Sequence, residues 1–186
     1  RHRARLSVRE VAKKGTVLVG FHEKRSSFIA DMKSCEILPK RVSDLLVPLR
    51  ELINSLSLRK KLPQIELAVT DEALALVLRV LEKLTADDEA KLRQFQKDYG
   101  VDFWYQPKGP DSIYPMDPEN ATRLKLHHRE TGVEVVFRPT DFTQVNHRLN
   151  EVMVTRVLRL LHLEPSSKVI DFFCGLGNFT LPLATR

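Results

Sequence analysis

The chain has 186 residues, of which 42% are hydrophobic and 29% are charged. This length suits one large domain, or one domain with part of another, and the hydrophobic content allows a packed core. No apolar run approaches the roughly 20 residues of a membrane span and no segment has the pattern of a signal peptide, so we expect a cytoplasmic protein with no membrane partner. In that compartment the two cysteines are not expected to form a structural disulfide.

The net charge of +6 is unevenly distributed along the chain. Residues 1–41 carry eleven Lys or Arg and four acidic residues, a local net charge of +7, whereas the other 145 residues sum to −1. A basic segment of this kind attracts the phosphate backbone of nucleic acids. The alternative is a solvated face that serves only solubility.

The first 110 residues contain several runs rich in β-branched and aromatic residues, which predict strands joined by short turns. The first two strands form a predicted hairpin whose turn ends in Gly15. Apolar residues at helical spacing predict an amphipathic helix at residues 40–56, with Pro48 as a potential kink. A charged helix is predicted at residues 87–99, closed by Gly100. The predicted strands are residues 3–11, 16–22, 27–32, 64–70, 73–80 (for which helix is the alternative) and 102–106.

Residues 123–129 and 133–137 form a second predicted hairpin. Hairpins mixed with single helices predict an α+β domain built on an antiparallel sheet and ending near residue 140. A third helix is predicted at residues 147–161, because apolar residues recur along one of its sides. The six histidines show no ligand or triad spacing, so a solvated role is predicted for them.

Residues 169–173 are a short apolar run of the kind that forms a strand buried on both faces. The run breaks into Cys174-Gly175-Leu176-Gly177-Asn178, which predicts a strand, a tight turn and a helix that opens near Asn178. Glycines allow positive φ and a close approach to a ligand, and the helix start presents free N–H groups. The turn is therefore a candidate cofactor site. A nicotinamide dinucleotide is disfavoured, because Thr180 stands where that fingerprint ends in Gly or Ala.

The run from Asp171 to Ala184, DFFCGLGNFTLPLA, resembles the first motif of the S-adenosylmethionine-dependent methyltransferases, in which the place of Phe173 is usually Gly. It is more similar to the uracil-5-methyltransferases of RNA, and among them to the branch that acts on bacterial 23S ribosomal RNA. The resemblance implies S-adenosylmethionine as cofactor and ribosomal RNA as partner, and no obligate protein partner is inferred. The cofactor contacts that it implies are Asp171 (whose role could instead be to hold the turn), Phe173, Gly175, Gly177 and Asn178.

The segment Asp141-Phe142-Thr143-Gln144-Val145-Asn146 resembles a DFxQxN run that members of this family carry just before the cofactor domain. The resemblance implies that Gln144 lies beside the S-adenosylmethionine site and Phe142 near the target base. An amide hydrogen-bonds polar groups without adding charge, which suits a zwitterionic cofactor. On pattern alone, Asn146 or Thr143 would be a helix cap and Phe142 a core anchor.

The sequence around Cys35 concerns a different kind of site, a metal cluster. Read alone, a cysteine after a strand is most often a small buried residue, and the same holds for Cys174. However, residues 33–38 resemble the K-x-C-x-I-L run of the ribosomal-RNA branch, where this cysteine is the fourth ligand of a [4Fe-4S] cluster. The resemblance implies that the other three ligands precede this chain, so that Cys35 alone cannot hold a cluster.

The family's mechanism implies attack of a Cys thiolate on C6 of uracil, methyl transfer to C5 and removal of a proton by a carboxylate. The resemblance places that Cys and that Glu after Arg186, so no catalytic residue is assigned within the chain. We therefore expect a fragment of an RNA uracil-5-methyltransferase, with a central α+β domain at residues 1–140 and the truncated start of a Rossmann-like methyltransferase domain at residues 141–186. The alternative is a noncatalytic RNA-binding module with a structural glycine turn, and a nicotinamide enzyme ranks third.

Overall fold

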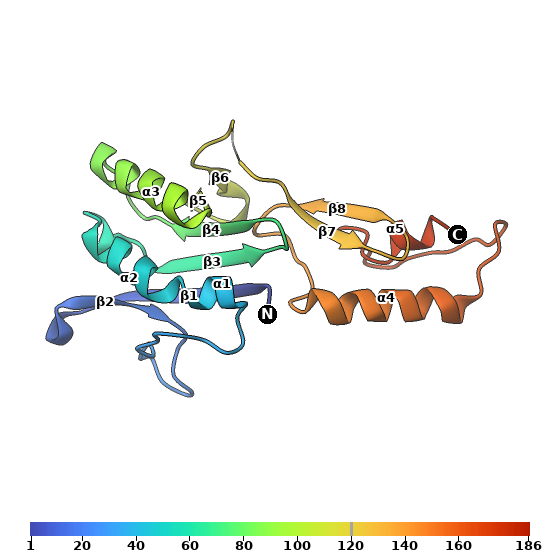
Figure 1. The fold of residues 1–186 in the computed structure, drawn as a ribbon, viewed down its shortest axis with the longest axis horizontal. Coiled ribbons are helices and arrows are strands. Elements are labelled where there is room, and N and C mark those ends of the chain that lie inside the picture. The colour runs from blue at the N-terminus through green and yellow to red at the C-terminus, as the bar shows by residue number, and fades with distance from the viewer. Residues whose placement is uncertain (120) are drawn as a thin grey trace.

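The computed structural model describes residues 1–119 and 121–186. The molecule is elongated, with a six-stranded sheet at one end and a β-hairpin, a long helix and the C-terminal segment at the other (Figure 1). We call the first part, residues 1–116, the sheet unit and the second part, residues 124–186, the hairpin unit. Among the described residues, no helix is long and apolar enough to cross a membrane.

The sheet unit is a mixed sheet in the strand order β2-β1-β3-β4-β5-β6. Neighbouring strands run antiparallel except β4 and β5, which are parallel because a helix crosses over between them. The predicted antiparallel sheet is thus confirmed for most of its ladders, and the predicted strand at residues 73–80 is also confirmed. The strands are β1 (Arg3–Val11), β2 (Thr16–Gly20), β3 (Gln64–Val69), β4 (Leu74–Arg79), β5 (Asp102–Gln106) and the short β6 (Tyr114–Pro115), which the sequence pattern did not predict.

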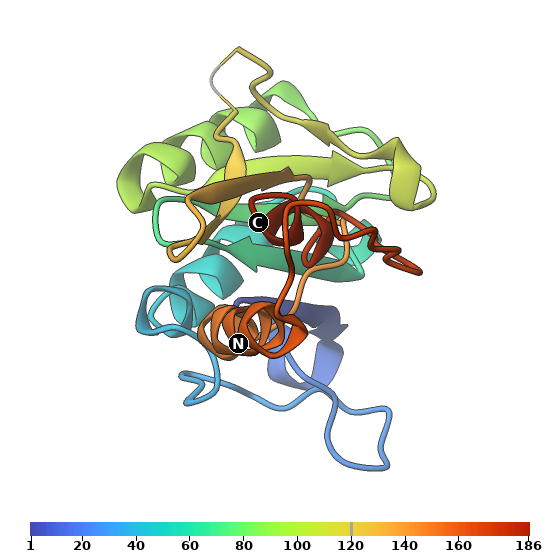
Figure 2. The ribbon, with the colours of Figure 1, turned by 90° about the vertical axis from the view of Figure 1, so that its right-hand side faces the viewer.

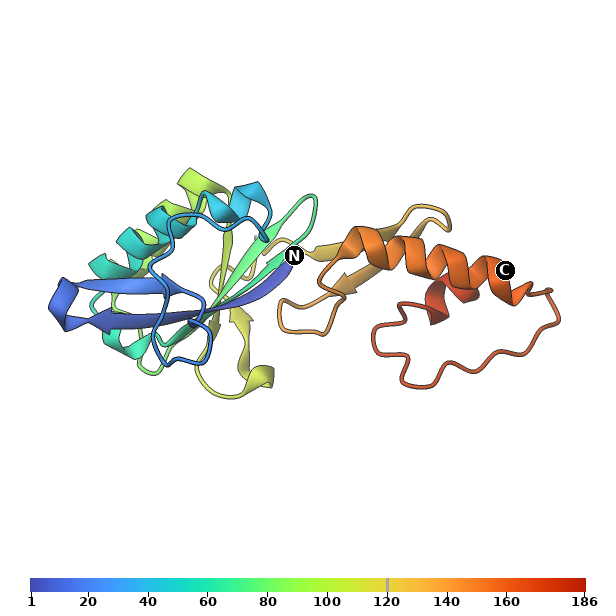
Figure 3. The same cartoon turned by 90° about the horizontal axis from the view of Figure 1, so that it is seen from below.

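Three α-helices, α1 (Lys40–Ser43), α2 (Leu46–Ser55) and α3 (Ala86–Tyr99), cover one face of this sheet (Figures 1 and 3). The α3 helix begins with a capping box, in which the Thr85 hydroxyl accepts from the Asp88 N–H and the Asp88 carboxylate accepts from the Thr85 N–H. It ends at Gly100, whose φ of 59° is the left-handed cap that was predicted. Three single-turn 3-10 helices complete the sheet unit: η1 (Ala12–Lys14), η2 (Arg59–Lys61) and η3 (Pro110–Ser112).

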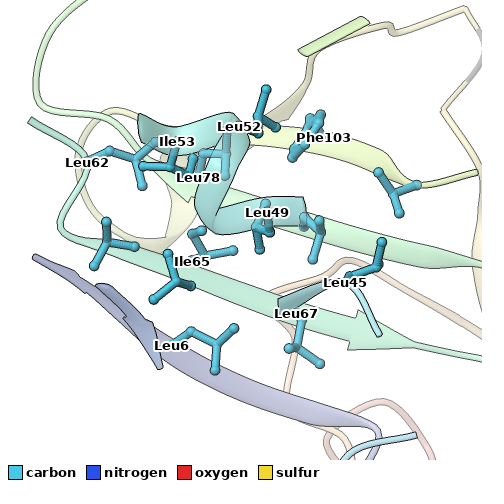
Figure 4. Packing of buried hydrophobic residues seen from close by; sticks show 14 of the residues in the cluster. Leu6, Leu45, Leu49, Leu52, Ile53, Leu62, Ile65, Leu67, Leu78 and Phe103 are labelled. Carbon is cyan, nitrogen blue, oxygen red and sulfur yellow. The ribbon is translucent and has the colours of Figure 1, made fainter. Parts of the chain in front are cut away.

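The main core lies between the sheet and these helices (Figure 4). Alternate residues of β3 and β4 point toward the helices, and Ile53, Ile65 and Leu78 are each 0% exposed. Burial of an aliphatic side chain of this size contributes about 1.5–3 kcal/mol. The sheet unit therefore has a core of its own.

Two predictions for the sheet unit are wrong. The helix predicted at 40–56 is two helices that break at Asp44 and Leu45 rather than at Pro48. The reason is that Pro48 has no N–H for the carbonyl of residue 44 and clashes with it, so the chain starts a new helix with Pro48 in its first turn.

The strand predicted at residues 27–32 is reduced to one bridge between His22 and Ile29. Asp31 in this segment accepts hydrogen bonds from Lys14 at 2.8 Å and Arg50 at 2.5 Å. The ion pairs of Asp31 hold this segment beside the sheet together with two backbone hydrogen bonds, from the Glu23 N–H to the Phe28 carbonyl and from the Ala30 N–H to the Phe21 carbonyl, each 2.9 Å long.

The hairpin unit consists of the predicted hairpin, β7 (Leu124–His128) with β8 (Val133–Phe137), and the predicted helix α4 (His147–Leu161) along one of its faces (Figures 1 and 3). The base of the hairpin packs on the sheet unit: Leu124 and Phe137 meet Ala68 and Ala75, whose small side chains allow a close approach. Figure 2 shows the start of the chain beside α4, where the His2 and His147 rings stack with centroids 4.1 Å apart.

The strand predicted at residues 169–173 is absent, which corrects the expectation of a run buried on both faces. Ile170 is 76% exposed and Phe173 is 102% exposed. A strand needs a neighbour for its N–H and C=O groups, and none of the strands in the described residues lies beside this run. The following helix, α5 (Thr180–Leu183), begins two residues after the predicted start.

Candidate functional site

A cavity of about 480 Å³ lies in the hairpin unit, between the loop before α4 and the turn before α5. Its base is formed by Leu126 of β7 and Val135 of β8. Residues far apart in the sequence therefore meet around one space. Five of the six predicted cofactor residues line it: Gln144, Asp171, Phe173, Gly175 and Asn178.

The loop wall of the cavity is fixed to the first strand of the sheet. The backbone N–H of Arg138 donates to the Asp141 carboxylate at 2.7 Å, which closes the loop on itself. The Arg3 guanidinium donates to the carbonyl oxygens of Asp141 and Pro139, the latter at 3.2 Å. In addition, the His2 N–H donates to the Val145 carbonyl at 2.7 Å. The segment that carries Gln144 is thus held from both sides by β1 and the residue before it.

The turn wall is shaped by three residues with positive φ. Phe173 has a φ of 63°, Gly175 of 57° and Gly177 of 85°. For a bulky residue such as Phe this conformation costs roughly 1–2 kcal/mol. A Cβ at Gly177 would lie 2.8 Å from Leu181 Cγ, whereas at Gly175 the nearest atom is 3.9 Å away.

Gly177, the sixth predicted cofactor residue, is not among the residues that line the cavity. Its lack of a side chain allows α5 to pack against the turn, since Leu181 occupies the space that a Cβ would need. In this structure Gly177 supports the turn from behind.

The polar side chains around the cavity differ in the hydrogen bonds that they make. The Thr180 hydroxyl donates to the Asp171 carboxylate at 2.6 Å, so Asp171 braces the turn against α5, the second role considered for it. The Asn178 amide exchanges two hydrogen bonds with Asn150 of α4. Within the described residues the Gln144 amide makes no hydrogen bond, and it is exposed. Gln144 therefore offers both a donor and an acceptor to a ligand.

The cavity is chemically mixed. Aromatic rings from both walls, including Phe142 and Phe179, stand near the Gln144 amide and the Asp171 carboxylate. Phe142 is 78% exposed, so it is not the core anchor that pattern alone indicated. Apolar rings beside a few polar groups are typical of sites for small organic ligands. The arrangement can hold a ligand with one flat apolar part and one charged part.

The N-cap of α4 is one of the two residues that the sequence pattern indicated. Asn146 is the N-cap, and its side chain accepts from the Leu149 N–H at 3.1 Å. Thr143 is 5% exposed, and its buried hydroxyl makes no hydrogen bond within the described residues. Of the two caps considered from the sequence, the structure thus selects Asn146.

The histidines are not uniformly solvated, which corrects that prediction. His128 is 8% exposed and its ring hydrogen-bonds the Thr131 hydroxyl at 2.8 Å. His2 and His147 stack at the edge of a second cavity of about 580 Å³, and burial, followed by the nearby His2, lowers the pKa of His147 to about 4. Residues far apart in the sequence form this pair, so no local pattern could have revealed it.

Cys35 lies in the sheet unit, half-buried against its core, and its N–H donates to the Ser43 hydroxyl at 2.8 Å. Cys174 lies in the hairpin unit and is exposed, contrary to the buried thiol predicted. The described residues contain no group of three or more His, Cys, Asp or Glu that could hold a metal ion. Because a [4Fe-4S] cluster needs four ligands, the two cysteines of this chain do not fit one by themselves.

The sheet unit, the hairpin unit and the cavity between loop and turn define an α+β protein with a ligand-sized site on its smaller part. The family model described as tRNA (Uracil-5-)-methyltransferase matches residues 1–186. The chain belongs to this family.

Curated relatives cover the chain from end to end. One from Ralstonia pickettii (strain 12J), named 23S rRNA (uracil(1939)-C(5))-methyltransferase RlmD, is 58% identical over 186 residues, covering 100% of this chain and 41% of the relative. A protein of the same name from Cupriavidus necator is 59% identical and is covered over 42% of its length. This chain thus spans about two fifths of the length of these relatives.

The fold is also similar to a solved structure. This is the crystal structure of Pyrococcus abyssi tRNA (uracil-54, C5)-methyltransferase in complex with S-adenosyl-L-homocysteine. The TM-score is 0.70 at 19% sequence identity, and the match covers 100% of this chain and 46% of the other. At this level of identity the likeness shows a shared fold.

Proposed function

We propose that this chain is part of a methyltransferase that transfers a methyl group from S-adenosylmethionine to C5 of a uridine in 23S ribosomal RNA. The observation that carries the proposal is the cavity that brings Gln144 together with Asp171, Phe173 and Asn178. The names of the two relatives support ribosomal RNA as substrate, and specifically the uridine that they number 1939. We propose a cytoplasmic location, which the ribosomal RNA in the names of these relatives supports.

The cavity suits S-adenosylmethionine by the chemistry of its walls. The exposed ring of Phe173 can pack on an apolar part of the cofactor, and the free amide of Gln144 can hydrogen-bond a polar part. Asn178 uses one N–H on Asn150 and keeps the other for a ligand. The Asp171 carboxylate favours positive charge nearby. When bound, the cofactor would supply an electrophilic methyl group.

We further propose that residues 1–140 form a central domain and residues 141–186 begin a Rossmann-like domain. The core of the sheet unit supports the first part, and the packing of Leu124 and Phe137 on Ala68 and Ala75 joins the hairpin to it. The apolar but exposed run 169–173 supports the second, because its composition is that of a buried parallel strand. In the complete gene product this run would pair with further strands.

The basic residues of positions 1–41 support an RNA-facing role for that end of the sheet unit. From the resemblance at residues 33–38, we propose that Cys35 contributes one thiolate to a [4Fe-4S] cluster whose other ligands lie outside this chain. Iron analysis of the anaerobically purified complete gene product tests this. We expect about four irons per molecule, their loss in Cys35→Ser and their retention in Cys174→Ser. Equal iron in both variants would refute the cluster assignment.

Methyl transfer tests the main proposal. The complete gene product, given tritium-labelled S-adenosylmethionine and unmodified 23S ribosomal RNA, should label one uridine. Gln144→Ala should raise the Kd for the cofactor about tenfold, since one or two hydrogen bonds are lost. A matched control is Gln94→Ala, because this exposed amide on α3 hydrogen-bonds only Asp98 among the residues that the structure describes. A protein that binds the RNA but neither binds the cofactor nor labels the RNA would be the noncatalytic RNA-binding module.

A further inference from the structure

The turn wall of the cavity is tied to α4 by a reciprocal pair of amides. Asn150 Nδ2 donates to Asn178 Oδ1 at 2.7 Å, and Asn178 Nδ2 donates to Asn150 Oδ1 at 3.0 Å. Both side chains are half-buried. Each amide thus satisfies a donor and an acceptor of the other, an arrangement that requires an amide on both sides.

In the part of the chain that the structure describes, this pair is the turn's one hydrogen-bonded link to an element outside the C-terminal segment. Among the described residues, every other hydrogen bond of residues 171–179 stays within the C-terminal segment, such as Thr180 to Asp171. A second anchor is the side chain of Leu176, which packs against the small core cluster that contains Leu124 and Phe137. Apolar packing fixes the depth of the turn, but it does not set the direction of a polar side chain.

The opposite wall is connected to the same helical turn. Asn146, two residues after Gln144, caps α4. The N–H of Asn150 donates to the Asn146 carbonyl at 2.9 Å, so Asn150 lies one helical turn beyond the cap. The first turn of α4 therefore carries the loop wall at its start and holds the turn wall through Asn150.

We propose that Asn150 is a positioning residue for the cofactor site. It fixes the separation of the Gln144 wall and the Asn178 wall, and it orients the Asn178 amide so that its remaining N–H and lone pair face the cavity. Asn150 itself does not line the cavity. This role rests on the proposed function, because it concerns the affinity of the same site for S-adenosylmethionine.

The test compares three variants of the complete gene product by calorimetry with S-adenosylmethionine and by steady-state methylation of RNA. Asn150→Ala should raise both the Kd and the KM for the cofactor about tenfold, because two hydrogen bonds are lost. The KM for RNA and the kcat at saturating cofactor should stay within about twofold. Asn150→Asp keeps an acceptor for the Asn178 N–H but has no donor. Its Kd for the cofactor should therefore lie between the Kd of the unsubstituted protein and that of Asn150→Ala.

The matched control is Glu151→Ala, the next residue of α4. Its carboxylate accepts from the Arg129 N–H at 3.0 Å, so this variant loses a contact between α4 and the hairpin without touching the turn. Its cofactor Kd should equal that of the unsubstituted protein.

Two results would overturn the role of Asn150 alone: an unchanged Kd in Asn150→Ala, or equal increases in Asn150→Ala and Glu151→Ala, which would indicate a general weakening of α4. If the unsubstituted protein fails to bind the cofactor, the proposed function itself is wrong, and the inference fails with it. The measurement on the unsubstituted protein therefore separates the two failures.

Discussion

The sheet unit and the hairpin unit differ in how far their apolar side chains are buried. In the sheet unit nearly every large apolar side chain of β3, β4 and α2 is buried between sheet and helix. In the hairpin unit several apolar residues of the C-terminal segment, such as Ile170 and Phe172, lie exposed. The comparison teaches that the first unit is stabilised by its own core, whereas the second is held by a few specific contacts.

The largest expected effect breaks the core of the sheet unit. In the 186-residue chain, Ile53→Ala removes a side chain that is 0% exposed and should lower the free energy of unfolding by about 2–5 kcal/mol. Ile170→Ala, at a side chain that is 76% exposed, should change it by less than about 0.5 kcal/mol. Hydrogen exchange resolved by region measures both. Similar costs for the two variants would contradict the difference between the units.

The same pair of variants sharpens the domain proposal. In the complete gene product, Ile170→Ala should become costly, because residues 169–173 are proposed to be a buried strand there. If Ile170→Ala stays neutral in the complete gene product, residues 169–173 are not such a strand.

A second comparison concerns one aspartate in each unit. Asp88 is 0% exposed and accepts from the Ser57 N–H at 2.8 Å and from the Ser57 hydroxyl at 2.5 Å. Asp88→Ala leaves these donors unpaired and breaks the capping box, so it should cost about 2–3 kcal/mol in thermal or urea unfolding. Asp171→Ala loses an exposed hydrogen bond to Thr180 and should cost under about 1 kcal/mol. Equal losses of unfolding free energy in the two variants would show that the hydrogen bonds of Asp88 and of Asp171 contribute equally to stability, which would contradict this comparison.

The two glycines of the turn test its geometry. Gly177→Ala places a Cβ 2.8 Å from Leu181 Cγ at a φ of 85°, and it should weaken cofactor binding by the complete gene product at least tenfold. Gly175→Ala also has a positive φ, but its nearest neighbour is 3.9 Å away, so the effect should be smaller. Isothermal titration with S-adenosylmethionine measures both affinities. A larger loss for Gly175→Ala would show that the turn adopts another shape when the ligand binds.

The smallest expected effect lies at the contact between the units. Burial and the nearby His2 lower the pKa of His147 from 6.5 to about 4, so the unfolded chain takes up this proton more readily than the folded one. The stability is therefore complete above pH 6.5 and falls as the pH drops from about 6.5 toward 4. Since the ring is only partly buried, we expect a loss of about 1–2 kcal/mol.

Thermal unfolding of the 186-residue chain and of His147→Gln across this pH range measures the effect. Carboxylates titrate in both proteins, so the difference between the two curves isolates His147. Parallel curves would mean that the stacked pair does not resist protonation.

The elements that the sequence predicted correctly are those whose signals are local. Gly100 closes α3 because its backbone needs a left-handed conformation, and the alternating residues of β3 match a sheet with one covered face. Pro48 was recognised as a potential kink, but the break that it causes lies at the residue four positions earlier. The run 169–173 was mistaken for a strand because its composition gives no information on whether a neighbour is present.

The cavity residues could be named from a family resemblance, yet their arrangement could not. Asn150 and the pair of His2 and His147 were missed, because each depends on a partner distant in the sequence. The role of Gly177 behind the turn likewise depends on where Leu181 packs. Local patterns thus located the site, and tertiary contacts decide how it is built.

A crystal structure of the complete gene product with S-adenosylhomocysteine tests the central claim most directly. The account predicts the ligand in the cavity between the loop and the turn, in contact with Gln144, Phe173 and Asn178. A ligand bound elsewhere, with this cavity filled by other side chains, would contradict it.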